Sequence, residues 1–323
     1  MVGSKRLEVA IPTYNRATFL DRNLSRLRSD IAAYCLSPRV PILVSDNGSD
    51  DETGAVLERH SAGIRALRQP KNVGLEANVL AALGEAREEY VLFLGDDDFL
   101  PPGYLARVVR LIDAEPNLAC VVPGIKIRYP DGRLRVARPF VFPERRFAPG
   151  YWTVLRLAHL GHQLSGLVVR REGLIEAYAA YPSLHNLYLF IFLVGHSMLR
   201  GVTWYFSQWG VEVTEGNPRH WSYDGTYLVS EAIKNYRLMF PHHRTKELAA
   251  SGMFIAQQAW RLGVGSGLRS AIVGCARFLK TQDVDWRLRA ALPLLVPIAY
   301  GFRLNNAIAR LVMRTRRIDL DSL

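Results

Sequence analysis

The chain has 323 residues, of which 49% are apolar and 22% are charged. This composition excludes a disordered or fibrous chain and leaves room for one large domain or two ordinary ones with ample core. The formal net charge of +11 favours anionic partners, which are nucleic acid, nucleotide phosphates or an acidic membrane face. The three cysteines form no Cys-x-x-Cys pair, so we expect thiols buried in a reducing cytosol.

Strand-like and helix-like segments alternate over the first 125 residues. The predicted strands lie at residues 7–14, 40–51, 64–69, 90–98 and 119–129. The predicted helices lie at residues 17–29, 52–60, 74–86 and 103–115. This alternation predicts a mostly parallel, Rossmann-like α/β sheet with helices on both faces.

The remainder of the chain changes character twice. Residues 126–140 resemble a hairpin with Pro-Asp-Gly in its turn, and strands are predicted at 165–172 and 201–208 around an apolar helix at 184–199. After Asn217 the pattern is helical, basic and amphipathic, and residues 226–323 carry 15 Lys and Arg against 6 Asp and Glu. We therefore predict an α/β domain at 1–222 and a helical region at 223–323.

The two ends of the chain show no pattern of a spanning segment. The first 15 residues have no apolar h-region, so we expect no signal peptide. The charge-free apolar run at 290–302 holds two prolines and is shorter than the about 20 residues that a spanning helix needs. We expect a cytoplasmic protein in which this run is buried or interfacial.

Three carboxylates end the strand at 90–98, and their cost needs an explanation. Asp96, Asp97 and Asp98 repel one another, and moving each carboxylate out of water costs free energy. Alternate residues of an extended segment point the same way, so Asp96 and Asp98 can converge on one ion while Asp97 points elsewhere, or a turn can present Asp97. Oxygen ligands of this kind suit Mg²⁺ or Mn²⁺. Alternatively, Asp98 caps the helix that follows Pro101-Pro102, which would explain one aspartate of the three.

Other polar residues follow the neighbouring predicted strands, where parallel sheets bind their ligands. Asp46 can accept the imide N–H of uracil or thymine, which cytosine lacks, or a ribose hydroxyl; the alternative is an Asx turn. Residues 11–16 can line a base pocket or form a plain strand–helix turn. Gly74, after Lys71 and Asn72, permits close approach of the backbone to a ligand.

Together these segments resemble the ordered motifs of the family-2 glycosyltransferases of GT-A fold. The motifs are "VAIPTYNR", "VSDNGSDD", "KNVGLEANV" and "YVLFLGDDD"; the resemblance is strong over residues 7–125 and weaker up to 222. It implies an inverting transferase that uses a nucleotide-sugar and Mn²⁺ or Mg²⁺. "GDDD" departs from the commoner "DxDD", which leaves open which aspartate binds metal directly. The resemblance implies that Asp46 contacts the base and that Asp96 to Asp98 form the site for ribose and metal. From all these segments we predict nucleotide binding by Pro12, Thr13, Tyr14, Asn15, Asp46, Lys71, Asn72, Gly74, Asp96 and Asp97, and metal binding by Asp96, Asp97, Asp98 and His220.

Inverting transfer needs a base that takes the proton of the acceptor hydroxyl. The family commonly places an Asp at the head of the helix that follows the "SGLVVRRE"-like strand, where this chain reads "PSLHNLYLF". We predict His185 as the base, because its unperturbed pKa near 6.5 suits the role. The alternative is a packing or capping histidine, and Glu172, Glu212 and Glu215 are weaker candidates for the base.

A second polar segment, residues 213–225, adds candidates for acceptor or diphosphate binding. Arg219 and His220 can meet the diphosphate or the metal, and Trp221 can stack on a sugar. The alternative is an ordinary exposed loop. The basic C-terminal helices suit an anionic membrane surface, or else they pack on the catalytic domain or make a homo-oligomer contact.

We therefore expect a glycosyltransferase of cell-envelope synthesis, peripheral on the inner face of the cell membrane, that acts on a glycan or polyprenyl-diphosphate-linked acceptor. Asp46 favours a UDP- or dTDP-sugar over a CDP-sugar. A nucleotidyltransferase is an alternative, but "IPTYNRATF" lacks the Gly-rich loop of that class. A nucleic-acid-binding protein is argued from charge alone; the apolar run beside the basic excess suits lipid better, so we expect no nucleic acid.

Overall fold

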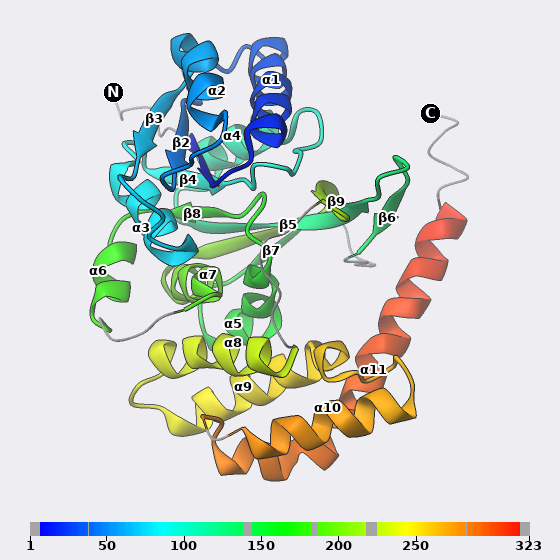
Figure 1. Cartoon of the computed structure of the whole chain (residues 1–323). Helices are drawn as coiled ribbons and strands as arrows, with labels where there is room; N and C mark the ends of the chain where they lie inside the picture. The colour runs from blue at the N-terminus through cyan, green and yellow to red at the C-terminus, as the bar shows by residue number, and fades with distance from the viewer. Residues whose placement is uncertain are drawn as a thin grey trace.

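The computed structural model describes residues 7–37, 39–137, 144–181, 186–217, 225–281 and 283–316. Across these residues a nine-stranded sheet forms the centre of the molecule, in the order β3-β2-β1-β4-β8-β5-β9-β7, with β6 paired to β5 (Figure 1). The strands are β1 (Leu7–Thr13), β2 (Ile42–Asp46), β3 (Arg65–Arg68), β4 (Tyr90–Phe93), β5 (Leu118–Arg128), β6 (Leu134–Val136), β7 (Arg145–Phe147), β8 (Val168–Arg170) and β9 (Val202–Thr214).

The sheet is mixed but mostly parallel, as the sequence predicts. β1 pairs in parallel with β2 and β4, β2 with β3, and β5 with β9. β8 runs antiparallel between β4 and β5, and β5 and β6 form the predicted hairpin. This order places the ends of β1, β2 and β4 side by side at one edge of the sheet.

Helices cover both faces of the sheet. They are α1 (Ala17–Ala33), α2 (Thr53–His60), α3 (Leu75–Glu85), α4 (Tyr104–Ala114), α5 (Tyr151–Leu157), α6 (Leu174–Ala179), α7 (Leu189–Arg200), α8 (Gly225–Met239), α9 (Arg244–Gln257), α10 (Leu268–Lys280) and α11 (Trp286–Arg316). Side chains alternate along β1: Leu7, Val9 and Ile11 join the core under α1, α2 and α4, whereas Ala10 faces the core of α3, α5 and α7.

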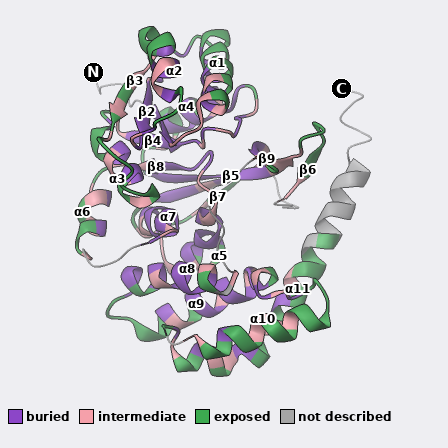
Figure 2. Ribbon diagram, in the orientation of Figure 1, coloured by how far each residue is buried: buried purple, intermediate pink, exposed green. Residues whose placement is uncertain are grey.

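The predicted helical C-terminal region is present, and its first two helices share the core of the sheet. Val229 of α8 and Phe254 of α9 belong to the same buried cluster as Phe93 of β4 (Figure 2). α10 and the start of α11 lie at the end of the molecule opposite α1 and α2 (Figure 1). The predicted boundary at 222/223 falls in 218–224, outside the described residues.

The expectation of three buried thiols is wrong for one cysteine. Cys120 is buried in β5 and Cys275 is half-buried, but Cys35 is exposed just after α1. Cys35 follows the helix in a left-handed conformation, with φ of 52°, in the turn that leads to β2. No disulfide joins the three, so the expectation of free thiols is confirmed.

Candidate active site

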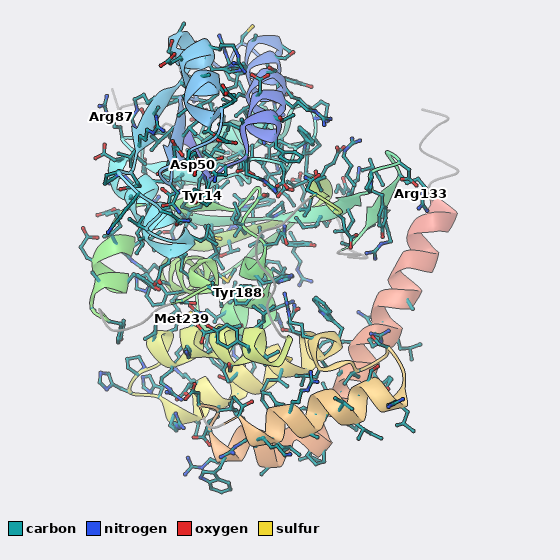
Figure 3. All side chains as sticks on the ribbon, in the orientation of Figure 1. Tyr14, Asp50, Arg87, Arg133, Tyr188 and Met239 are labelled. Carbon is teal, nitrogen blue, oxygen red and sulfur yellow. The ribbon has the colours of Figure 1, made fainter. Side chains whose placement is uncertain are left out.

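The polar residues predicted at the strand ends lie together in the structure. In the parallel ladder of β1 and β2, Pro12 pairs with Ser45 and Thr13 with Asp46. The Thr13 hydroxyl donates a hydrogen bond of 2.7 Å to Oδ2 of Asp96, which follows β4. The ends of three neighbouring strands therefore meet at one site, and Figure 3 shows Tyr14 and Asp50 at the same edge.

The turn after β1 is locked to the loop after β2. The backbone N–H of Asn15 donates to Ser49 Oγ at 2.9 Å, and the N–H of Asp50 donates to Asn15 Oδ1 at 3.0 Å. Asn15 adopts φ of 52°, a left-handed conformation that Asn tolerates better than most residues. This pair of bonds fixes the backbone of residues 13–16, the predicted wall of a base pocket.

The two carboxylate oxygens of Asp46 have different surroundings: one forms the turn that the sequence predicts, and the other accepts no hydrogen bond. Its Oδ1 accepts the N–H of Ser49 at 3.0 Å, as in an Asx-type turn. Its Oδ2 accepts no hydrogen bond, although Arg68 Nε lies 3.2 Å away, and the residue is 0% exposed. Because Arg68 covers this atom, a base reaches Oδ2 of Asp46 only when Arg68 shifts.

The loop before α3 is held against the loop after β2. Asn72 Oδ1 accepts both Asn47 Nδ2 and the Gly74 N–H at 2.9 Å, and Asn47 Oδ1 accepts the Val73 N–H at 2.9 Å. Gly48 has φ of 73°, and a Cβ there would lie 2.6 Å from the backbone carbon of Lys71. Within the protein, the close backbone approach is therefore made at Gly48.

Gly74 itself stands at a more open place. It precedes α3 with φ of 87°, and a Cβ there would meet no atom within 4 Å. No described protein atom makes a close approach here, and the approach of a ligand to Gly74 stays a prediction. The side chain of Lys71 is exposed beside it.

The three aspartates have different surroundings. Asp98 is buried, and its two carboxylate oxygens accept Ser165 Oγ and, at 2.9 Å, the N–H of Thr214. Asp97 is the least buried of the three, and its Oδ2 accepts Asn217 Nδ2 at 2.8 Å. In this structure the carboxylate of Asp98 is thus taken up by protein donors, while Asp97 lies at the surface of the site.

Arg16 brings a positive charge onto the aspartates. Its Nε donates to Asp96 Oδ1 at 3.4 Å, and its Nη2 contacts Asp97 Oδ2. Burial, and then the charge of Asp97, raise the pKa of Asp96 to about 6. The same two causes raise the pKa of Asp98 to about 7. Burial thus disfavours the charged forms of Asp96 and Asp98, and a cation placed beside them favours those charged forms.

Two of the three aspartates are placed to hold a divalent cation. Among the described residues, no three Asp, Glu, His or Cys side chains are placed to hold a metal ion. Asp96 and Asp97 nonetheless converge on one cationic group, the Arg16 guanidinium. Mg²⁺ and similar ions are often held by one or two carboxylates plus substrate phosphates, so this pair fits such an ion.

Four predicted residues lie outside the described part of the chain: His185, Arg219, His220 and Trp221. Beside the first of them, the N–H of Asn186 donates to Glu76 Oε2 at 2.8 Å, and Tyr178 donates its hydroxyl to Glu76 Oε1. Glu212, a weaker candidate for the base, is paired with Arg128 through Oε2.

Several residues of the site escaped the sequence reasoning. Arg16, Asn47 and Ser49 stood inside the quoted motifs without being singled out. Ser165, Thr214 and Asn217 lie 67 to 120 residues from the aspartates they contact, and no local pattern marks them. Asn23 is another: buried in α1, it donates to the backbone oxygens of Gly95 and Asp98 at 2.9 and 2.6 Å.

Comparison with known proteins identifies the family. The model of glycosyl transferase family 2 matches residues 8–172, about half of the chain. The chain belongs to this family. The matched segment runs from β1 to the end of β8 and contains the strand ends, the loop before α3 and the three aspartates of the candidate site.

Solved structures share the GT-A fold over nearly the whole chain. S. aureus TarS 1–349, in complex with UDP-GlcNAc, has a TM-score of 0.64 at 17% identity, covering 97% of this chain and 92% of that one. The mannosyltransferase PcManGT from Pyrobaculum calidifontis, in complex with GDP-Man and Mn²⁺, has a TM-score of 0.51 at 16% identity over 94% and 88%. The predicted fold class is confirmed.

Curated relatives match over shorter stretches. The GalNAc(5)-diNAcBac-PP-undecaprenol beta-1,3-glucosyltransferase of Campylobacter jejuni is 30% identical over 109 residues, 32% of this chain and 34% of its own length. Matches to the curated relatives span between 15% and 39% of their lengths. Among the described residues, no helix has the length and apolar character needed to cross a membrane.

Proposed function

We propose that this family-2 glycosyltransferase moves a sugar from a UDP- or dTDP-sugar to a hydroxyl of a glycan or lipid-linked acceptor, with inversion, in cell-envelope synthesis. The observation that carries the choice of nucleotide is Oδ2 of Asp46, a buried acceptor without a hydrogen bond at the strand ends. Uracil and thymine offer an imide N–H to such an acceptor, and cytosine does not. The TarS complex holds a uridine nucleotide-sugar on the same fold.

The proposed cofactor is Mn²⁺ or Mg²⁺, held by Asp96 and Asp97 together with the donor diphosphate; Asp98 and His220 stay predicted ligands. When bound, the ion stabilises the negative charge of the departing nucleotide. Hydrogen bonds within the chain orient the two carboxylates: Thr13 donates to Asp96, and Asn217 donates to Asp97. The PcManGT complex, which contains Mn²⁺, supports the choice of metal on this fold.

For the acceptor side, we propose His185 as the base that removes the hydroxyl proton, with Arg219 and Trp221 near the acceptor or the diphosphate. The Campylobacter relative's printed name includes an undecaprenol-linked diphosphate, which supports a polyprenyl-diphosphate-linked acceptor. Such an acceptor lies in a membrane, so we propose that the protein works on the inner face of the cell membrane as a peripheral protein.

The nucleotide can be tested by thermal unfolding with UDP, dTDP, CDP and GDP, each with Mn²⁺ or with EDTA. A ligand that binds only the native state raises the midpoint with the logarithm of its saturation. We expect the largest shifts with UDP or dTDP in Mn²⁺, and the loss of the preference over CDP in Asp46→Asn. Equal shifts with all four nucleotides, or a CDP preference, would contradict the proposed donor.

A further inference from the structure

One face of α11 is apolar and exposed along most of its described length. Every third or fourth residue from Trp286 to Leu304 is apolar and exposed, which matches one side of a helix with 3.6 residues per turn. Trp286, Leu294 and Leu304 are 62%, 73% and 64% exposed. This apolar stripe, about 27 Å long at 1.5 Å per residue, comprises Trp286, Ala290, Pro293, Leu294, Pro297, Gly301 and Leu304.

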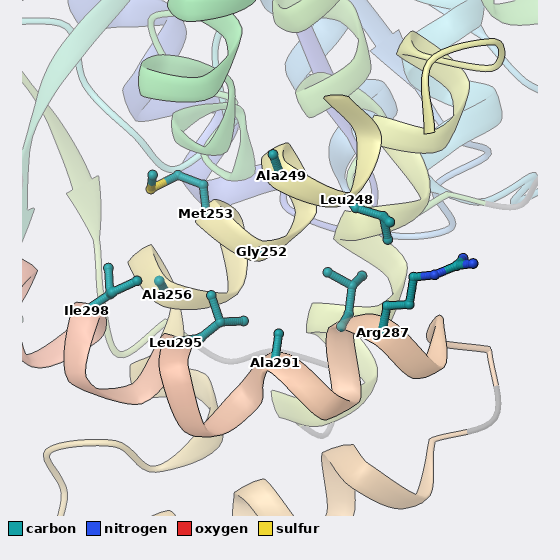
Figure 4. A pocket seen from close by; sticks show the side chains of 10 residues that line it. Leu248, Ala249, Gly252, Met253, Ala256, Arg287, Ala291, Leu295 and Ile298 are labelled. Carbon is teal, nitrogen blue, oxygen red and sulfur yellow. The ribbon is translucent and has the colours of Figure 1, made fainter. Parts of the chain in front are cut away.

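An apolar groove opens beside the stripe. It lies between α9 and α11, has a volume of about 380 Å³, and is lined by Leu248, Gly252, Met253, Leu295 and Ile298 among others (Figure 4). Arg287 is the one charged residue in its lining. Ile298 both lines the groove and is 47% exposed, so it joins the groove to the side of the stripe.

α10 and α11 carry a strong positive charge. Residues 268–316 contain nine Lys and Arg against two Asp. On α10, exposed Leu268 and Ile272 are flanked on one side of the helix by exposed Arg269, Arg277 and Lys280. Exposed apolar side chains beside exposed cations, as on α10, match the interface of a bilayer with anionic headgroups.

We infer that α10 and α11 form a docking face for an anionic lipid bilayer, with the apolar stripe of α11 inserted at the boundary between headgroups and acyl chains. This inference rests on the proposed function, because a lipid-linked acceptor brings the enzyme to a membrane. A second copy of the chain is a poorer occupant of this face. A two-fold contact would set each positively charged face against itself, and like charges across an interface oppose association.

The test measures binding of the full chain to vesicles by co-sedimentation, with no donor or acceptor present. Vesicles of phosphatidylcholine alone are compared with vesicles containing equal parts of phosphatidylglycerol. We expect binding to the anionic vesicles, with a blue shift of tryptophan emission. Trp286→Ser with Leu294→Ser should weaken binding by about tenfold or more, because each change removes a large apolar group from the lipid. Trp152→Ser is the matched control, since this tryptophan of α5 is 68% exposed and outside the face.

The charged part of the face is tested with Arg269→Gln and Lys280→Gln. Each basic residue near an anionic surface contributes about 1 kcal/mol, so the pair should weaken binding by about tenfold or more. Arg22→Gln with Arg110→Gln makes the same charge change on exposed sites of α1 and α4, and should leave binding unchanged.

Three outcomes contradict the inference. Binding that is equal in wild type and face variants, or no binding to anionic vesicles, overturns it. A dimer in solution that Leu294→Ser dissociates, without vesicle binding, assigns the face to a second copy. Thermal shifts with nucleotides, measured on the same variants, test the transferase separately. Vesicle binding without any nucleotide shift would refute the proposed donor and leave the docking face standing.

Discussion

Arg16 determines how much negative charge the candidate site presents before a ligand arrives. Its guanidinium contacts Asp96 and Asp97, the two carboxylates proposed to hold the metal. A divalent ion at the same carboxylates is repelled by a cation within a few ångströms, and this repulsion is strong where water is scarce. Arg16 therefore competes with the metal until the diphosphate of the donor adds its own negative charge.

We predict that Arg16→Gln binds Mn²⁺ about tenfold more tightly than wild type when no nucleotide is present. The measurement is the electron paramagnetic resonance signal of free Mn²⁺ during a titration. Arg22→Gln removes an exposed positive charge from α1, the helix that Arg16 precedes, and should leave Mn²⁺ binding unchanged. Unchanged or weaker Mn²⁺ binding in Arg16→Gln would show that the guanidinium does not compete with the ion.

Asp97 and Asp98 should respond differently to the same substitution. We expect Asp97→Asn to keep the fold, because the amide oxygen can still accept the hydrogen bonds that Asn217 and Arg16 donate to Asp97. We expect it to lose the Mn²⁺-dependent part of the nucleotide thermal shift. Asp98→Asn places an amide N–H₂ against Ser165 Oγ or the Thr214 N–H, both of which donate to Asp98. A buried donor left without an acceptor costs about 1–3 kcal/mol.

Unfolding of the two variants in urea distinguishes these roles. We expect Asp98→Asn to lower the free energy of unfolding and Asp97→Asn to leave it within about 0.5 kcal/mol of wild type. If Asp98→Asn is as stable as wild type but fails to bind Mn²⁺, the main role of Asp98 is to bind the metal and not to stabilise the fold.

At the scale of elements, the sequence predicted the helices and strands whose hydrophobic periodicity is visible within a single segment. The alternating segments up to β5 carry strand or helix patterns separated by turn residues, and all were predicted, as was the hairpin of β5 and β6. β7, α5 and α6 have only 3, 7 and 6 residues. They are held by packing on distant elements, and their segments are too short to show a clear periodicity in the sequence. β9 extends six residues beyond its predicted end because its ladder with β5 continues to Thr214.

The site divides in the same way. Thr13, Asp46 and Asp96 could be placed together from sequence, because the ends of neighbouring parallel strands meet at one edge. The contact of Thr214 with Asp98 could not, because it depends on where β9 ends in the folded sheet. The contact of Glu76 with Asn186 joins α3 to the start of α7 across 110 residues, and it likewise has no local signal.

Glu76 gives a prediction at this scale, because it ties α3 to the segment that precedes α7. Its two oxygens accept the Tyr178 hydroxyl and the Asn186 N–H, and Asn186 in turn bonds to Asn235 of α8 at 2.6 Å. Glu76→Gln forces one amide N–H₂ toward a donor. We expect the free energy of unfolding to fall by about 1–3 kcal/mol, measured in urea, with faster amide exchange near Asn186.

The control for this variant is Glu85→Gln, at the exposed end of the same helix, where we expect no change. If Glu76→Gln is as stable as wild type, the tether does not hold α3 against α7. A loss of activity in that variant would then point to a direct chemical role for the Glu76 carboxylate.

At the scale of the whole molecule, the sheet and the first C-terminal helices form one body. Val229, Ala232 and Tyr236 of α8 and Phe254 of α9 are buried in the cluster that fills the space beneath β4 and α7. The basic region therefore differs along its length. α8 and α9 complete the core of the catalytic fold. α10 and α11 add Phe278, Leu288 and Leu292 to the same buried cluster, and on their exposed sides they carry the apolar stripe and most of the positive charge.

This division predicts the result of two truncations. A chain that ends at Asp224 loses α8 and α9, which pack on α7 and α5, and so exposes part of the apolar cluster that these helices share. It should therefore be insoluble or unfold without a cooperative transition. A chain that ends at Asn305 keeps every described residue of the buried clusters, the last of which is Ala299. It should stay soluble and give the same nucleotide thermal shift as the full chain. A soluble, nucleotide-binding chain ending at Asp224 would show that the α/β domain folds alone, and that α8 and α9 only dock on a core that is already complete.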